Sequence, residues 1–187
     1  MTAPSDVIAV ILAAGLSRRF GKDKLLYPFH GRPLAAHIAD TLEAMPLGWR
    51  IAICPADSPA RIELFRERGF EVIENDDPTR GMGSSLALGA KRAIAVGAEA
   101  MLVCLGDMPN VTAAHLFSLI AGLGDGDVVA TVANGTRSPP VILNARRLTE
   151  VTALTDDQGA RHLLGSAAVV EASPELVRDF DVPEDFG

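Results

Sequence analysis

The stretch Leu12-Ala13-Ala14-Gly15-Leu16-Ser17-Arg18-Arg19-Phe20-Gly21, with Lys24 three residues further on, decides the fold. It follows an apolar run, Val7 to Leu12, that is typical of a buried parallel strand. The chain then enters a loop of small residues and four cations, which are Arg18, Arg19, Lys22 and Lys24. Small residues let backbone N–H groups approach an anion, and arginine and lysine supply positive charge beside it. This pattern predicts a loop that binds the phosphates of a nucleotide.

Two common phosphate-binding loops do not match this stretch. A Walker loop has four residues between its first glycine and a Gly-Lys pair, which Ser or Thr follows. Here five residues separate Gly15 from Gly21-Lys22, and Asp23 comes next. The dinucleotide fingerprint G-x-G-x-x-G fails at its second glycine, because Ser17 holds that position. Neither of these two loop types therefore explains the stretch.

Composition indicates one soluble α/β domain that spans residues 1–187. The chain is 48% hydrophobic and 22% charged, which suits a packed core and argues against disorder. Its net charge of −7 argues against a nucleic-acid partner, which would favour a basic face. We interpret Cys54 and Cys104, at the ends of predicted strands, as buried small hydrophobes in a reducing compartment. No signal peptide or membrane-length apolar run is visible, so we expect a cytoplasmic protein without membrane association.

Strand-like apolar runs alternate with helical patterns along the chain. Strands are predicted at residues 7–12, 50–54, 71–74, 100–105, 127–132, 140–143 and 168–171. Helices are predicted at residues 33–45, 59–68, 84–96, 112–122 and 158–164. Such alternation predicts right-handed βαβ crossovers and a largely parallel sheet. Ligands of these sheets bind outside the carboxyl ends of the strands, where the remaining motifs fall.

The second motif, Gly81-Met82-Gly83-Ser84-Ser85-Leu86, opens a predicted helix. Serines at a helix start are good N-caps, and we expect that structural role for at least one of them. Glycines also permit close backbone approach, and a serine hydroxyl with helix N-terminal amides can bind the polar edge of a base. Gly83, Ser84 and Ser85 are therefore also candidate nucleotide-binding residues.

Two further motifs supply carboxylates. In Leu105-Gly106-Asp107-Met108-Pro109 an aspartate directly follows a buried strand, so that it points into the expected crevice. The C-terminal segment Asp179 to Asp185 is acidic, and without context it would be a solvated end. Mg²⁺ is held by one or two carboxylates, with its other ligands from water and substrate phosphates. An ordinary turn is the alternative role for Asp107.

These motifs together resemble those of the nucleotidyltransferases related to the molybdenum-cofactor enzymes. The opening stretch matches L-A-A-G-x-S-x-R-[MF]-G-x-x-K, and residues 81–86 match G-M-x-x-S-L. Residues 105–109 match L-x-D-M-P, and the tail resembles D-I-D-T-P-E-D with Val182 in place of threonine. The Ala-Ala pair is closer to the cytidylyltransferase branch. The resemblance implies a Rossmann-like three-layer α/β/α sandwich with a mostly parallel sheet, of the nucleotide-diphospho-sugar-transferase type.

The resemblance also implies roles for individual residues. Catalytic roles fall to Lys24, Arg19 and Asp107, and the Mg²⁺ ligands are Asp107 and Asp181. Nucleotide binding is implied for Leu12, Ala13, Ala14, Gly15, Lys24, Gly83, Ser84, Ser85 and Gly106. The implied reaction transfers CMP from CTP to the molybdopterin-bound molybdenum cofactor and releases pyrophosphate. An apo-molybdoenzyme that receives the product is a further implied partner.

One segment departs from the cytidylyltransferase pattern and leaves the acceptor open. Where that branch has R-G-[HN]-P facing the acceptor, this chain has Arg137-Ser138-Pro139-Pro140, and Pro139 cannot donate a hydrogen bond. Residues 157–164 match the D-x-G-A-R-x-L-L helix of the same branch and favour it again. The alternatives are another phosphorylated acceptor such as a sugar phosphate, a transfer from GTP, and a non-catalytic nucleotide or cofactor carrier.

Overall fold

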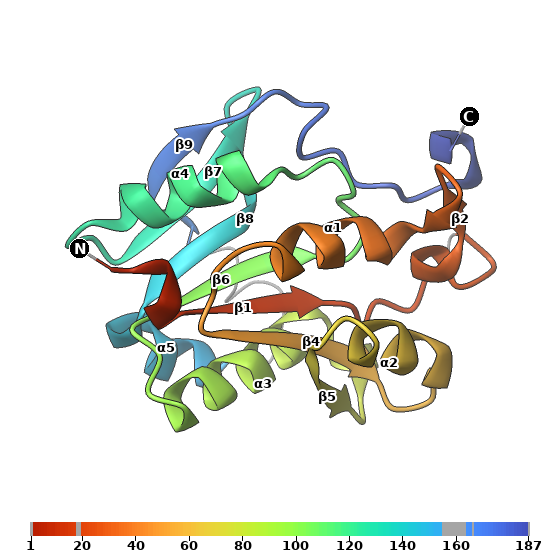
Figure 1. Cartoon of the computed structure of the whole chain (residues 1–187), viewed down its shortest axis with the longest axis horizontal. Coiled ribbons are helices and arrows are strands. Elements are labelled where there is room, and N and C mark those ends of the chain that lie inside the picture. The colour runs from red at the N-terminus through yellow and green to blue at the C-terminus, as the bar shows by residue number, and fades with distance from the viewer. Residues whose placement is uncertain (1, 18–19, 155–163, 166, 187) are drawn as a thin grey trace.

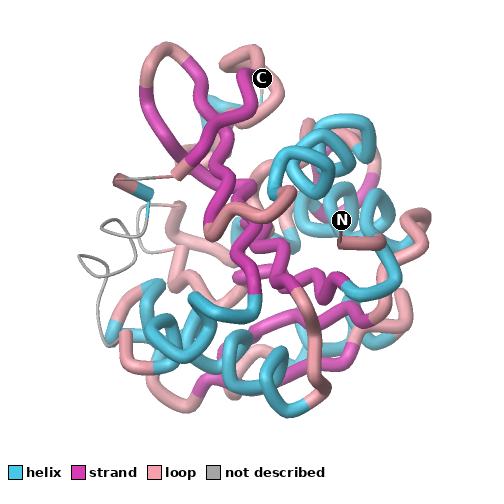
Figure 2. The backbone as a smooth tube through the Cα atoms, turned by 90° about the vertical axis from the view of Figure 1, so that its left-hand side faces the viewer, coloured by secondary structure: helices cyan, strands magenta, loops and turns pink. Residues whose placement is uncertain are grey.

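A twisted seven-stranded sheet forms the middle layer of the molecule (Figures 1 and 2). The computed structural model describes residues 2–17, 20–154, 164–165 and 167–186. The strand order is β5-β4-β1-β6-β8-β7-β9. Their bounds are β1 Val7–Leu12, β4 Trp49–Pro55, β5 Glu71–Asn75, β6 Ala100–Leu105, β7 Val128–Ala133, β8 Thr136–Asn144 and β9 Ala168–Glu171. Strand β8 runs antiparallel to β6 and β7, and the other neighbouring pairs are parallel.

Helices cover both faces of this sheet, which makes the three-layer α/β/α sandwich that the resemblance implied (Figure 1). Their bounds are α1 Leu34–Glu43, α2 Pro59–Arg66, α3 Met82–Ala95, α4 Ala113–Leu123 and α5 Ala145–Thr152. Buried side chains of α1, α2 and α4 share one hydrophobic cluster, and those of α3 and α5 share another. In the described segments, no helix is both long enough and apolar enough to span a membrane.

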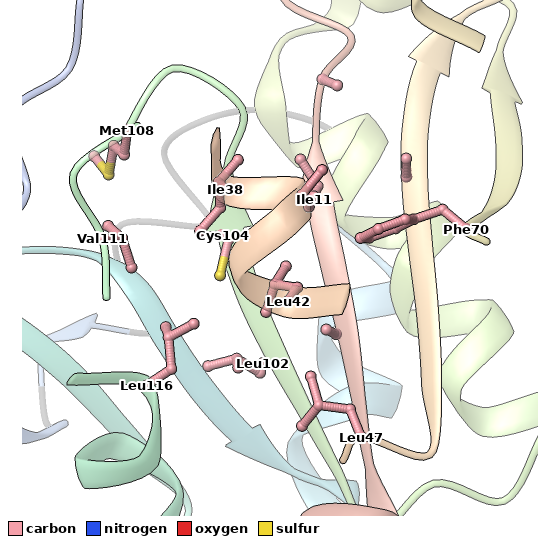
Figure 3. Packing of buried hydrophobic residues seen from close by; sticks show 14 of the residues in the cluster. Ile11, Ile38, Leu42, Leu47, Phe70, Leu102, Cys104, Met108, Val111 and Leu116 are labelled. Carbon is pink, nitrogen blue, oxygen red and sulfur yellow. The ribbon is translucent and has the colours of Figure 1, made fainter. Parts of the chain in front are cut away.

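Strand β1 is buried on both faces, as its continuous apolar run predicts. Val7, Ala9 and Ile11 face the α1 side, while the alternate residues of the strand face α3. Figure 3 shows the first side, where Ile11 lies close to Ile38 and Leu42 of α1. A strand held in this way gives a rigid base for the loop that follows it.

Both cysteines are free and buried, as expected for small core residues. Burial raises the pKa of the Cys54 thiol and of the Cys104 thiol to about 12. Thiols with such pKa values stay protonated and unreactive at neutral pH. The cysteines therefore serve packing and supply no nucleophile.

Every predicted strand is present, and helices α1, α2, α3 and α4 begin and end within about two residues of the predicted bounds. Helix α5 and the hairpin of β2 (Pro28–Phe29) and β3 (Arg32–Pro33) were not predicted. Helix α5 buries only Leu148 and Val151, too short a pattern to stand out in the sequence. The helix predicted at residues 158–164 lies outside the described residues, apart from residue 164.

Helix α3 approaches β1 closely at Gly89, and we expect Gly89→Ala to destabilise the fold. A Cβ atom at this position would lie 2.8 Å from Cγ1 of Val10, which is completely buried. Overpacking of this kind costs about 1–3 kcal/mol, more than the ~1 kcal/mol that alanine gains over glycine in a helix. Denaturant unfolding would measure the loss. The Val10→Ala background should reduce it, and a Gly89→Ala protein as stable as wild type would contradict the packing argument.

Candidate active site

A cleft of about 410 Å³ opens where β1 and β6 end, the position expected for a ligand of a parallel sheet. Its walls come from the loop after β1, the turn after β6, the segment before α3 and the C-terminal tail. The predicted site residues that line it are Leu12, Ala14, Gly15, Lys24, Gly106, Asp107 and Asp181. Pro78 and Thr79 also line it, although no motif pointed to them.

Lys24 joins the two predicted metal ligands in this cleft. Its Nζ atom donates to Oδ2 of Asp107 at 2.7 Å and to Oδ1 of Asp181 at 2.5 Å. The Lys24 side chain is only 12% exposed, so the pair of contacts is shielded from water. Burial by itself would lower the pKa of Lys24, but the two carboxylates outweigh it and the pKa is raised. Lys24 therefore stays protonated between two carboxylates.

This donor set fits a magnesium ion. Asp107 and Asp181 each direct an oxygen at the same ammonium group, so the two oxygens converge on one position that a cation prefers. Mg²⁺ needs no more than two carboxylates when phosphates and water complete its shell. Among the described residues, no group of three or more His, Cys, Asp or Glu side chains is arranged to hold a metal. The chemistry of the pair thus suits a metal that arrives with a polyphosphate.

Asp185 fixes the backbone that carries Asp181. Its Oδ2 atom accepts the amide protons of Asp181 at 2.8 Å and Val182 at 3.0 Å, while Oδ1 accepts from Arg178 at 2.7 Å. These donors, the Val182 amide first, lower the pKa of the Asp185 carboxyl to about 2. The carboxylate is therefore ionised and ties the tail into a tight turn.

Aromatic rings anchor the same tail to the N-terminal half of the chain. Phe180 is 3% exposed, and its ring centroid lies 4.7 Å from that of Phe29. Phe186 lies 4.9 Å from Tyr27 and 5.3 Å from Phe20. Figure 1 shows the C-terminal end beside β2. Edge-to-face packing of this kind adds to the burial of the rings, so Asp181 sits on a docked segment.

The loop after β1 uses only part of its backbone for the cleft. Ala14 and Gly15 line the cleft, but the Ala13 amide donates to the Ile53 carbonyl at 2.9 Å and extends the β1–β4 pairing. Ala13 is completely buried, so its predicted contact with the nucleotide is not available in this structure. Arg19, predicted to be catalytic, lies outside the described residues.

The serine motif lies beside the cleft rather than on its wall. Gly83, Ser84 and Ser85 are absent from the cleft lining, whereas Gly81 and Met82 belong to it. Asn75 holds both serines, because its Nδ2 atom donates to Ser84 Oγ at 3.0 Å and to Ser85 Oγ at 2.9 Å. The base contact that we predicted for Ser85 therefore has no support in this geometry.

The helix also begins two residues earlier than predicted. Gly81 is the N-cap residue of α3, with φ of 86°, a left-handed conformation that favours glycine. Ser84 and Ser85 thus fall in the first turn, and Ser84 Oγ donates back to the Gly81 carbonyl at 2.8 Å. The prediction that one of the serines is the N-cap was wrong.

Most of the chain is similar to proteins of one known family. Residues 9–172 match the MobA-like NTP transferase domain family. The chain belongs to this family. Like its other members, this MobA-like protein is a nucleotidyltransferase.

Two relatives and one solved structure illustrate the likeness. The MobA-like chain is 30% identical to purine catabolism protein PucB of Bacillus subtilis, over 96% of this chain and 94% of PucB. It is 33% identical to a probable molybdenum cofactor guanylyltransferase of Pyrococcus horikoshii, over 78% of this chain and 72% of that protein. The crystal structure of Rv0371c from Mycobacterium tuberculosis superposes with a TM-score of 0.83 at 24% identity, covering 100% of this chain and 97% of that one. The last comparison supports the fold.

Because Asp185 orders the turn that bears Asp181, we expect Asp185→Ala to weaken metal binding. The variant loses the acceptor of two backbone amides and the partner of Arg178. Loss of such a supporting group typically lowers metal affinity about 10- to 100-fold. Titration with Mn²⁺, followed by electron paramagnetic resonance, would measure it. Asp57→Ala, at an exposed position, is the control, and equal affinities for both variants would refute this role of Asp185.

Proposed function

We propose that this MobA-like nucleotidyltransferase transfers CMP from CTP to the molybdopterin-bound molybdenum cofactor and releases pyrophosphate, with Mg²⁺. The observation that carries the proposal is the convergence of Asp107 and Asp181 on Lys24 in the cleft. Two carboxylates for a metal and a lysine for a phosphate are the groups that phosphoryl and nucleotidyl transfer need.

The proposed chemistry is a direct displacement at the α-phosphate. A phosphate oxygen of the acceptor forms a bond to the α-phosphorus, and the bond from that phosphorus to the pyrophosphate oxygen breaks. The acceptor phosphate is already ionised near neutral pH, so the chain needs no strong general base. Its residues have to align the two phosphates and neutralise their charge.

Each residue of the cleft has a part in that alignment. Asp107 and Asp181 would hold Mg²⁺, which when bound would supply positive charge that stabilises the reacting phosphates. Lys24 and Arg19 would bind the triphosphate and stabilise the departing pyrophosphate. The amides of the loop after β1 would bind the phosphates from the opposite side. To bind the triphosphate, the ammonium of Lys24 has to leave Asp107 and Asp181.

A second cleft of about 450 Å³ is our candidate for the acceptor. Its lining includes Met108, next to Asp107 in the sequence, and Asp179, two residues before Asp181. It also includes Ser138, from the segment that differs from the cytidylyltransferase pattern. Burial, together with the charges of Asp107 and Asp181, raises the pKa of the Asp179 carboxyl. An acceptor bound there would place its phosphate next to the metal ligands.

The choice of CTP rests on resemblance and on one relative. The Ala13-Ala14 pair and the Gly81-Met82 segment resemble the cytidylyltransferase branch, and the same branch makes the cofactor of xanthine-dehydrogenase-type enzymes. The name of PucB places that protein in purine catabolism. Because xanthine is a purine, this relative favours the cytidylyltransferase branch. GTP is the second candidate, because the Pyrococcus relative is named a guanylyltransferase.

Pyrophosphate release tests the proposal. The protein is incubated with Mg²⁺ and each of the four NTPs, with and without the molybdopterin-bound cofactor. Release that needs both CTP and the cofactor is the expected result, and release with GTP instead would assign the guanylyl reaction. Tight NTP binding without release would favour another acceptor such as a sugar phosphate, or a carrier that delivers to an apo-molybdoenzyme.

We expect Asp107→Ala to abolish turnover while the fold survives. Asp107 follows β6, and its backbone carbonyl, which the substitution retains, accepts the Phe180 amide at 3.2 Å. Loss of a group that acts on the reacting phosphates should reduce kcat at least about 10²-fold. Steady-state kinetics and thermal unfolding are measured together, with Asp57→Ala as the control. An unchanged rate for Asp107→Ala would remove this residue from the site.

A further inference from the structure

Arg61 of α2 is a buried cation that binds four residues of the segment after β1, which are Ala13, Gly15, Ser17 and Asp23. The residue is 4% exposed. Its Nη1 atom donates to the carbonyl oxygens of Ala13 at 2.7 Å and Gly15 at 2.8 Å. Its Nε atom donates to Oδ2 of Asp23 at 2.6 Å, and its Nη2 atom donates to Ser17 Oγ at 3.4 Å. One guanidinium thus binds the start, the middle and the end of the loop.

These bonds determine where the loop amides point. In a trans peptide the carbonyl of one residue and the amide N–H of the next lie in one plane and point in opposite directions. Because Arg61 draws the carbonyls of Ala13 and Gly15 towards α2, the amides of Ala14 and Leu16 are directed away from α2. Both residues line the cleft, and neither amide donates a backbone hydrogen bond within the described part of the chain.

Arg61 also supports the turn that presents Lys24. It binds Asp23, whose Oδ1 atom accepts the Leu25 amide at 3.1 Å and caps the 3₁₀ turn Lys24–Leu26. Ser17 Oγ accepts the Lys24 amide at 3.3 Å as well as the bond from Arg61. A planar guanidinium can hold these divergent acceptors at once, whereas the single ammonium of lysine cannot.

We propose that Arg61 is a positioning residue for the nucleoside triphosphate. It holds the loop so that the amides of Ala14 and Leu16 and the ammonium of Lys24 face the phosphates together. This inference rests on the proposed role of the loop in phosphate binding. It adds a residue from a helix that no phosphate-binding motif of the sequence includes.

The Arg61→Lys variant tests this role against Arg68→Lys. Arg68 is a matched control, because it also binds a carboxylate, Asp40 at 2.7 Å, and a carbonyl, Leu64 at 2.9 Å, and neither partner belongs to the loop after β1. Calorimetry with Mg²⁺ and CTP or GTP gives nucleotide affinity, and hydrogen exchange gives the protection of the amides at positions 14 and 16. Arg61→Lys should bind nucleotide about 10- to 100-fold more weakly and alter exchange at these amides. Arg68→Lys should change neither.

A purely structural role would lower the melting temperature but leave the nucleotide affinity of the folded protein unchanged, and that result would overturn the proposal. If Arg61→Lys folds poorly, Asp23→Asn replaces it in the test. This variant keeps the side-chain volume and weakens one bond of Arg61, the bond to residue 23, so it should lose less nucleotide affinity. The exchange measurement needs no nucleotide, so it tests Arg61 even if the proposed substrate is wrong. Unaltered exchange at positions 14 and 16 would refute the positioning role directly.

Discussion

The contact of one ammonium group with two carboxylates organises the cleft. Lys24 comes from the loop after β1, Asp107 from the turn after β6 and Asp181 from the C-terminal tail, so the contact joins three distant segments. Two partly buried carboxylates would repel each other, and a shielded ammonium between them offsets this repulsion and their desolvation. The segments are therefore held together by the same charges that the chemistry requires.

The sheet brings two of these segments to the same edge, where β1 and β6 end. Strands β1 and β6 pair in register up to Leu12 and Leu105, and the Gly106 amide extends the pairing by donating to the Leu12 carbonyl at 3.1 Å. A Cβ on Gly106 would lie 3.1 Å from Leu25 Cδ1, so glycine lets the turn approach the loop that carries Lys24. The tail joins by the Phe180 amide, which donates to the Asp107 carbonyl. Short-range backbone bonds thus set the distance over which the charges act.

The sequence predicted the features that depend on residues close together along the chain. The run from Val7 to Leu12 is buried on both faces, and a carboxylate after β6 reaches the cleft, as expected from strand length and sheet topology. Arg61 was missed because an arginine in an amphipathic helix reads as a surface residue, and only tertiary packing reveals its buried acceptors. Ser85 does not line the cleft, because the left-handed Gly81 starts α3 early and Asn75 of β5 donates a hydrogen bond to the Ser85 hydroxyl. Pairings between distant residues leave no periodic signal in the sequence.

Under the proposed function, the contact between Lys24 and its carboxylates also couples metal and nucleotide. Asp107 and Asp181 can accept a metal ion at their shared position only when the ammonium of Lys24 gives it up. Burial makes an unpaired ammonium costly, so Lys24 needs a new anion, and a triphosphate in the same cleft supplies one. Metal and nucleotide then each remove an obstacle to the other, which is positive coupling between two ligands of one site. Without a nucleotide, a metal ion has to displace the ammonium of Lys24 from the two carboxylates, so it binds more weakly than in the presence of the triphosphate.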